Sequence, residues 1–177
     1  MPEYAVTAIG RDRPGIVAAI SRSLLELDGN LEDSQMSILR GHFAVMLIVR
    51  VPDGTAEEEL ARSLGAVRDE LDLEAVTFKA VDELAATGPR ASHVITVYGA
   101  DHPGIVAAVS SVLADNGANI TDLETRLAGT AEAPLYVMQI EVALGDADTA
   151  RLEEALRQTG EESQVEISLR ELEADPL

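Results

Sequence analysis

The chain has 177 residues, of which 46% are hydrophobic and 3% aromatic, and its 13 basic and 32 acidic residues give a net charge of −19. This charge argues against nucleic acid and anionic membrane surfaces as direct partners, because both are bound through basic side chains. The lack of cysteine excludes a disulfide framework, a thiol nucleophile and cysteine-based metal sites.

A short motif occurs twice in the chain. Residues 10–21 read GRDRPGIVAAIS, and residues 99–110, 89 positions later, read GADHPGIVAAVS. An offset of about half the chain predicts two copies of one small domain rather than a solenoid.

The first copy of the motif predicts a turn between a strand and a helix. The preceding residues 4–9 are apolar and partly β-branched, whereas residues 16–27 carry apolar side chains at helical spacing. Pro14 suits the first turn of that helix, and Asp12 is placed to accept from the helix's first N–H groups. Gly15 removes a side chain, so that another group can approach the backbone closely.

Because the chain opens directly on this strand, without a signal peptide or a membrane-length apolar run, we expect a soluble cytoplasmic protein.

The rest of the first copy predicts three more strands and a second helix. Thr55 with Glu58 predicts a capping box at the start of that helix. The order β-α-β-β-α-β predicts an α+β domain of the ferredoxin-like kind, a four-stranded antiparallel sheet with both helices on one face. The remaining elements are a turn at 28–30, a strand at 31–39, a hairpin turn at 40–42, strands at 43–51 and 73–81, and the helix that opens at 55.

The second copy repeats this order after an expected linker. We expect a first domain at 1–82, the linker at 83–92 and a second domain at 93–177. Pairing Val45 with Val137 gives an offset of 92 in the third strand, so we expect the second hairpin loop, at 128–134, to be three residues longer.

Each predicted sheet leaves one face without helices. In the strand at 43–51 both faces are largely apolar, and left exposed they would make a patch larger than monomers usually tolerate. We therefore expect the halves to pack together and the chain to form a homodimer, with edge pairing as one way to hide free strand edges.

The repeated pattern resembles the ACT domain, a small ferredoxin-like module that binds amino acids and regulates enzymes or transcription. In both copies a strand leads into Asp-x-Pro-Gly-Ile-Val-Ala-Ala, and an asparagine follows the glycine at the same separation, from Gly15 to Asn30 and from Gly104 to Asn119. The resemblance covers both copies and almost the whole chain. Two such domains and little else also resemble, by architecture, the glycine cleavage system transcriptional repressor group.

The resemblance implies an amino-acid site where the turn before the first helix and the start of the second strand meet, at an interface between two domains. Backbone N–H groups at a helix N-terminus suit a carboxylate, and Asp and Asn oxygens suit an ammonium group. No metal or other cofactor is implied. The residues carried over are Asp12, Arg13, Gly15, Ile16 and Asn30 in the first copy, and Asp101, His102, Gly104, Ile105 and Asn119 in the second.

The same residues also have purely structural interpretations. Some amino-acid-binding members carry Asn in place of Asp12, so this aspartate either holds the ammonium group or caps the helix and repels the carboxylate. The asparagines would otherwise end the first helices, and the glycines would serve close packing. His102, which replaces Arg13, is expected to be a solvated loop residue rather than a pH-sensing contact.

We expect a regulatory protein rather than an enzyme, because the sequence offers no complete nucleophile–base set and no metal cluster. It would sense a small amino acid, glycine or serine among the candidates, and control a protein partner, either a transcription factor or a metabolic enzyme. Two alternatives stay open. One is a small acylphosphatase-like hydrolase, suggested by Arg11 and Arg13 but not by the second copy, and the other is a ligand-free dimerisation module.

Overall fold

A computed structural model describes residues 1–81, 88–130 and 134–172 of the chain. The chain divides into two units, Met1–Leu84 and Ala85–Leu177, each with its own hydrophobic core. Half of the expected linker (83–87) and part of the expected second hairpin loop (131–133) lie outside the described residues, so the predicted domain limits remain a prediction.

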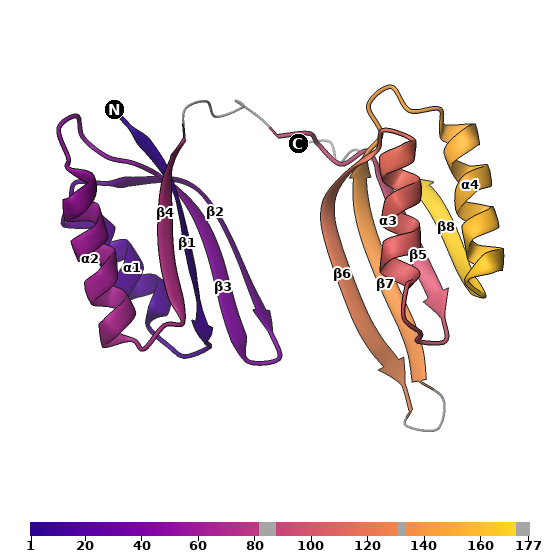
Figure 1. Ribbon diagram of the computed structural model, residues 1–177, viewed down its shortest axis with the longest axis horizontal. Helices are drawn as coiled ribbons and strands as arrows, with labels where there is room; N and C mark the ends of the chain where they lie inside the picture. Colours follow the sequence, from indigo (N-terminus) through magenta and orange to yellow (C-terminus); the bar gives the residue numbers. More distant parts are fainter. Residues whose placement is uncertain (82–87, 131–133, 173–177) are drawn as a thin grey trace. The chain divides into compact units, whose positions relative to one another are not determined.

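The first unit is a four-stranded antiparallel sheet in the order β2-β3-β1-β4, with both helices on one face (Figure 1). This confirms the expected ferredoxin-like arrangement. Its elements are β1 (Glu3–Arg11), α1 (Ile16–Leu25), β2 (Asn30–Leu39), β3 (His42–Arg50), α2 (Glu57–Glu70) and β4 (Ala75–Val81).

The second unit repeats the arrangement with the order β6-β7-β5-β8. The central strands again have one buried and one more open face, as a sheet covered by helices on one side requires. Its elements are β5 (His93–Gly99), α3 (Ile105–Asp115), β6 (Asn119–Gly129), β7 (Pro134–Ala143), α4 (Thr149–Glu162) and β8 (Val165–Glu171).

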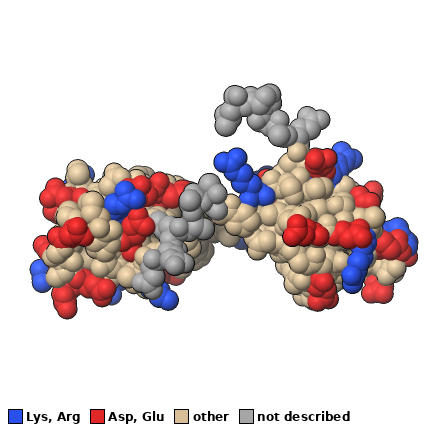
Figure 2. All heavy atoms as spheres, turned by 90° about the horizontal axis from the view of Figure 1, so that it is seen from above, with Lys and Arg blue, Asp and Glu red and all other residues tan. Residues whose placement is uncertain are grey.

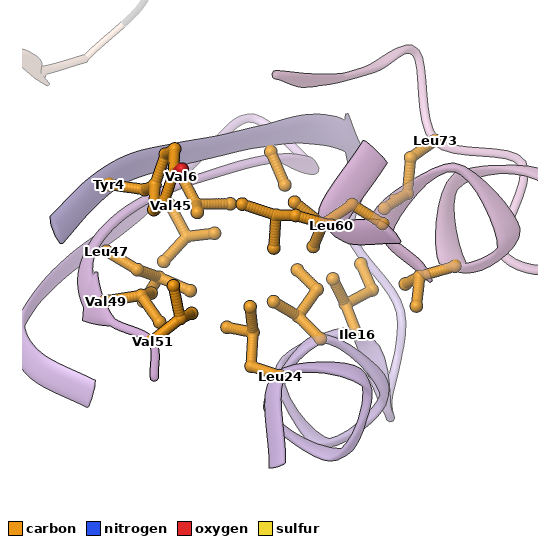
Figure 3. Packing of buried hydrophobic residues seen from close by; sticks show 14 of the residues in the cluster. Tyr4, Val6, Ile16, Leu24, Val45, Leu47, Val49, Val51, Leu60 and Leu73 are labelled. Atoms are coloured by element: carbon orange, nitrogen blue, oxygen red, sulfur yellow. The ribbon is translucent and has the colours of Figure 1, made fainter. Parts of the chain in front are cut away.

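The core of the first unit lies between the sheet and the helices (Figure 3). Alternate residues of β1 and β3 face the helices because side chains in a strand alternate between its two sides. Ile16 and Leu24 of α1 and Leu60 of α2 meet them from the helix side. Full burial of each such aliphatic side chain stabilises the fold by about 1.5–3 kcal/mol.

The third strands of the two copies align differently from the prediction. Gly10 pairs with Phe43 in the first unit, and its counterpart Gly99 pairs with Tyr136 in the second. The structural offset is therefore 93 rather than 92, and the second hairpin is four residues longer, not three. Pairing Val45 with Val137 was therefore wrong by one residue. The error matters because a one-residue slip moves every side chain of a strand to the opposite face of the sheet.

Both first helices begin later than predicted. Gly15 and Gly104 are their N-caps, with φ of 99° and 103°, so Pro14 precedes α1 instead of lying in its first turn. This left-handed backbone explains the two glycines, since residues with a Cβ rarely adopt it. The predicted Thr55 capping box is also wrong: α2 begins after Ala56 without a side-chain cap.

The edge strand β2 is exposed along its whole length, and β6 is exposed except at Ile120, which packs against the core of the second unit. Met36 and Ile38 of β2 are 47% and 48% exposed, although they lie on the helix side of the sheet. On the open side, Met46 of β3 is 54% exposed. The homodimer prediction is based on the two faces of the strand at 43–51, to which only Met46 of these three residues belongs. No helix within the described residues is long and apolar enough to cross a membrane.

Candidate functional site

The turn before α3 borders a hollow of about 350 Å³. Residues 101–107 form one wall of this hollow, and Tyr136 of β7 contributes another. Gly104 turns the chain so that α3 starts here, and its carbonyl oxygen accepts the bond from Ala108 at 2.9 Å. The first N–H groups of a helix have no acceptor within the helix, and they carry the positive end of its dipole. The hollow thus has hydrogen-bond donors in the backbone and the carboxylate of Asp101 in one place.

His102 ties this turn to the end of α4. Its Nδ1 lies 3.1 Å from the carbonyl oxygen of Pro103, and its Nε2 lies 2.7 Å from that of Ser163. Carbonyl oxygens only accept hydrogen bonds, so both contacts are satisfied only when the ring is protonated. The bonds to Pro103 and Ser163 accordingly raise the pKa of His102, and the charge of Asp101 adds to them. His102 is therefore a partly buried structural contact, which corrects the expectation of a solvated loop residue.

Tyr136 was not among the predicted site residues. Its side chain is 8% exposed, and its hydroxyl donates to the sulfur of Met138 at 3.7 Å. Burial first, and the negative charge of Asp101 second, raise the pKa of Tyr136, so the phenol lies within electrostatic reach of that carboxylate. An alignment of the aromatic residues Phe43 and Tyr136 would have indicated this position from the sequence.

The corresponding turn of the first unit is more open. Asp12, Arg13 and Gly15 are exposed, while Ile16 is 1% exposed and packs into the core. The backbone N–H of Asp12 donates to the carbonyl of Gly41 at 2.9 Å, which fixes the turn against the β2–β3 hairpin. No side chain caps either α1 or α3, so the structure does not support a capping role for Asp12 or Asp101. Ile105 matches Ile16: it is 2% exposed and packs into the core of the second unit.

Asn30 lies at the opposite end of the first unit from the Asp12 turn. Arg11, at the turn, pairs with His42, whereas Asn30 pairs with Arg50. These partners are eight residues apart on β3, which corresponds to about 26 Å in a strand. Asn119 is likewise remote from the Asp101 turn, since it pairs with Ala143 at the far end of β7. The structure therefore brings the turn residues of each copy together, but not the asparagines with them.

The asparagines do not end the first helices either. Asn30 is the first residue of β2, and its side-chain amide donates to Glu32 at 2.8 Å. Arg50 joins the same cluster through Glu32 at 3.1 Å and Glu3 at 2.7 Å, so that it links three strands. Ala143 takes the place of Arg50 in the second unit, and Asn119 has no such cation across the pair.

A larger hollow of about 570 Å³ follows the groove between α1 and α2. Ser23 and Ser63 meet there at 2.6 Å, one hydroxyl from each helix. None of the predicted site residues lines this groove.

Figure 2 shows acidic side chains spread over both units with single basic ones among them, as the net charge of −19 implies. Among the described residues, no three His, Asp or Glu side chains gather as metal ligands would.

Known proteins resemble this chain along both units. A UPF0237 protein of Methanopyrus kandleri is 45% identical over 76 residues, which are 42% of this chain and 80% of that protein. The glycine cleavage system transcriptional repressor of Escherichia coli K12 is 26% identical over 155 residues, which are 86% of this chain and 80% of the repressor. The crystal structure of an unknown protein from Galdieria sulphuraria superposes with a TM-score of 0.79 at 29% identity, over 97% of this chain and 98% of that one.

The family model of the ACT domain matches the chain twice, at residues 5–78 and 92–170. The first segment runs from β1 to β4 and the second from β5 to β8, so each match covers one ferredoxin-like unit. The M. kandleri relative aligns with less than half of this chain, whereas the E. coli repressor aligns with most of it. The chain therefore belongs to the ACT-domain family and carries two copies of the domain in tandem.

Proposed function

We propose that this protein is a regulatory sensor that binds a small free amino acid and passes the signal to a protein partner. One observation carries the proposal: the hollow at the start of α3 combines backbone N–H groups with the carboxylate of Asp101. These are complementary to the carboxylate and the ammonium group that every free amino acid carries.

The amino-acid carboxylate would bind the first N–H groups of α3, where the helix dipole favours negative charge. The ammonium group would bind Asp101, which the helix does not use as a cap. The protonated ring of His102 would keep the turn in place through Ser163. In the first unit Asp12 and the N-terminus of α1 offer a second, more open site of the same kind.

We further propose that the site is completed between two domains. Asn30 and Asn119 lie at the far ends of their own units, so they reach a bound amino acid only from a neighbouring domain, within the chain or in a second copy. A ligand held between two domains stabilises the arrangement that forms the site, by as much as its affinities for the alternative arrangements differ. A homodimer that responds to the ligand in this way would present a changed surface to the partner.

The E. coli relative is named as a transcriptional repressor of the glycine cleavage system, which makes glycine and serine the first ligands to test. The net charge of −19 disfavours DNA as a direct partner, so control of transcription would run through another protein in the cytoplasm. The hydrolase alternative has no counterpart of Arg11 and Arg13 in the second turn, and we propose no catalytic activity.

Calorimetric titration of the full chain with the common amino acids tests the proposal. We expect one or a few small amino acids to bind, and Asp101→Asn to weaken binding at least about tenfold, since a hydrogen bond to a charged group contributes about 1.5–3 kcal/mol. Asp115→Asn, which removes the same charge at the other end of α3, serves as the matched control. If no amino acid binds, or if both variants bind as the wild type does, the proposed function is wrong.

A further inference from the structure

The two ACT domains differ at one buried position behind the motif turn. Phe43 and Tyr136 occupy equivalent places, because each lies opposite the glycine that ends the first strand of its domain. Both rings are buried, at 2% and 8% exposure. The second domain therefore has a phenol hydroxyl where the first has a hydrogen atom.

This hydroxyl has a poor partner within its own domain. It donates to the thioether sulfur of Met138 at 3.7 Å, and a thioether is a weak acceptor. Buried hydroxyl groups are normally paired with oxygen or nitrogen, because leaving them without a good partner costs free energy. The arrangement thus holds a donor that a better acceptor could take over.

Tyr136 lines the hollow at the start of α3 together with Asp101, whose negative charge acts on the phenol and adds to the rise in its pKa. Tyr136 is the one residue of the wall that does not come from residues 101–107, so it bounds the space on the side of β7. A ligand with its α-carboxylate at α3 and its ammonium group at Asp101 would direct its side chain away from both, toward the remaining wall. Tyr136, which forms that wall, would therefore be the residue that the ligand side chain contacts.

We propose that Tyr136 makes the second domain selective for amino acids whose short side chain carries a hydroxyl or carboxamide oxygen, over those with a hydrogen atom or a methyl group. This inference rests on the proposed function, since it concerns the same site. A side-chain oxygen of the ligand would replace the Met138 sulfur as acceptor. A ligand without that oxygen leaves the phenol with its weak partner, which is how a polar pocket rejects an apolar analogue. Phe43 gives the first domain no such preference.

The test compares serine with alanine, which differ by one hydroxyl group. Affinities for both are measured by calorimetry on the full-length wild type, on Tyr136→Phe and on Tyr98→Phe. Tyr136→Phe keeps the ring and removes the hydroxyl, and Tyr98, which is 43% exposed on β5, loses the same group outside the hollow. Thermal unfolding of each variant verifies that its fold is kept.

We expect wild type and Tyr98→Phe to favour serine over alanine, and Tyr136→Phe to lower that preference by about 2–10-fold, as loss of one neutral hydrogen bond predicts. Equal serine-to-alanine ratios in wild type and Tyr136→Phe, or a wild type that prefers alanine, would overturn the inference while leaving an amino-acid sensor. If wild type binds neither these nor any other amino acid, the proposed function fails and the inference fails with it.

Discussion

His102 lies with its Nε2 at 2.7 Å from the carbonyl oxygen of Ser163, and this contact joins the motif turn of the second domain to the residue that follows α4. Ser163 is at the C-terminal end of a helix, where the dipole favours a positive charge. A protonated imidazole is thus stabilised on both of its nitrogens.

We predict that His102 titrates above the ordinary histidine value of about 6.5 in the folded chain. Because the folded pKa is raised, the contact contributes its full stability below the unfolded value and loses it as the pH rises through the folded value. NMR titration of the His102 ring gives the folded pKa, and the same titration in urea gives the reference. A folded pKa at or below the urea value would refute this.

Gly15→Ala should destabilise the first domain by about 1–2 kcal/mol, the cost of a left-handed backbone for a residue with a Cβ. An added Cβ at Gly15 would meet no atom within 4 Å, so the cost comes from the backbone and not from a clash. Gly65→Ala in α2, which also meets no atom, is the matched control and should stabilise by about 0.5–1 kcal/mol. Urea unfolding of both variants measures the two changes in the free energy of unfolding. A change of the same sign in both variants would count against the explanation.

The pKa of Glu154 is lowered to about 2 by its hydrogen bonds to Arg157 and then to Gln158. Arg157 also contacts Glu161, one turn farther along α4. Since the folded pKa is lowered, this stabilisation is complete above the ordinary glutamate value of 4.5 and disappears as the pH falls through about 2. Glu154→Gln should therefore show a smaller drop in melting temperature between pH 5 and pH 2 than wild type does, and Glu153→Gln should show the wild-type drop.

The homodimer prediction can be tested at β2. All ten residues of this edge strand are exposed, and its free backbone groups can pair with another strand. We expect Met36→Lys to raise the dissociation constant of the dimer in sedimentation experiments, because a charge on an edge strand opposes pairing. Met46→Lys, on the open face of the sheet, distinguishes edge pairing from face-to-face packing of two sheets. If only Met46→Lys loses association, the dimer packs face to face and not through β2.

Much of the fold could be predicted because the motif around Gly15 and Gly104 repeats at a constant offset and marks the same strand-to-helix turn twice. The position of Tyr136 could not be derived in this way, since the hairpin before it differs in length and the short Val-Met identity favoured the wrong register. Asn30 was grouped with Asp12 by resemblance. The topology of a strand, a helix and a parallel strand already places the start of β2 at the far end from the turn.

Because each domain has its turn at one end and its asparagine at the other, two domains that lie side by side and share a ligand as proposed would run in opposite directions. A two-fold arrangement of this kind brings turn to asparagine at both ends simultaneously, as an isologous contact requires. Ligand sites would then form in pairs. Ligand binding would then favour association of the two domains, and association would favour ligand binding. If the domains belong to two chains, the apparent affinity for the amino acid would rise with protein concentration.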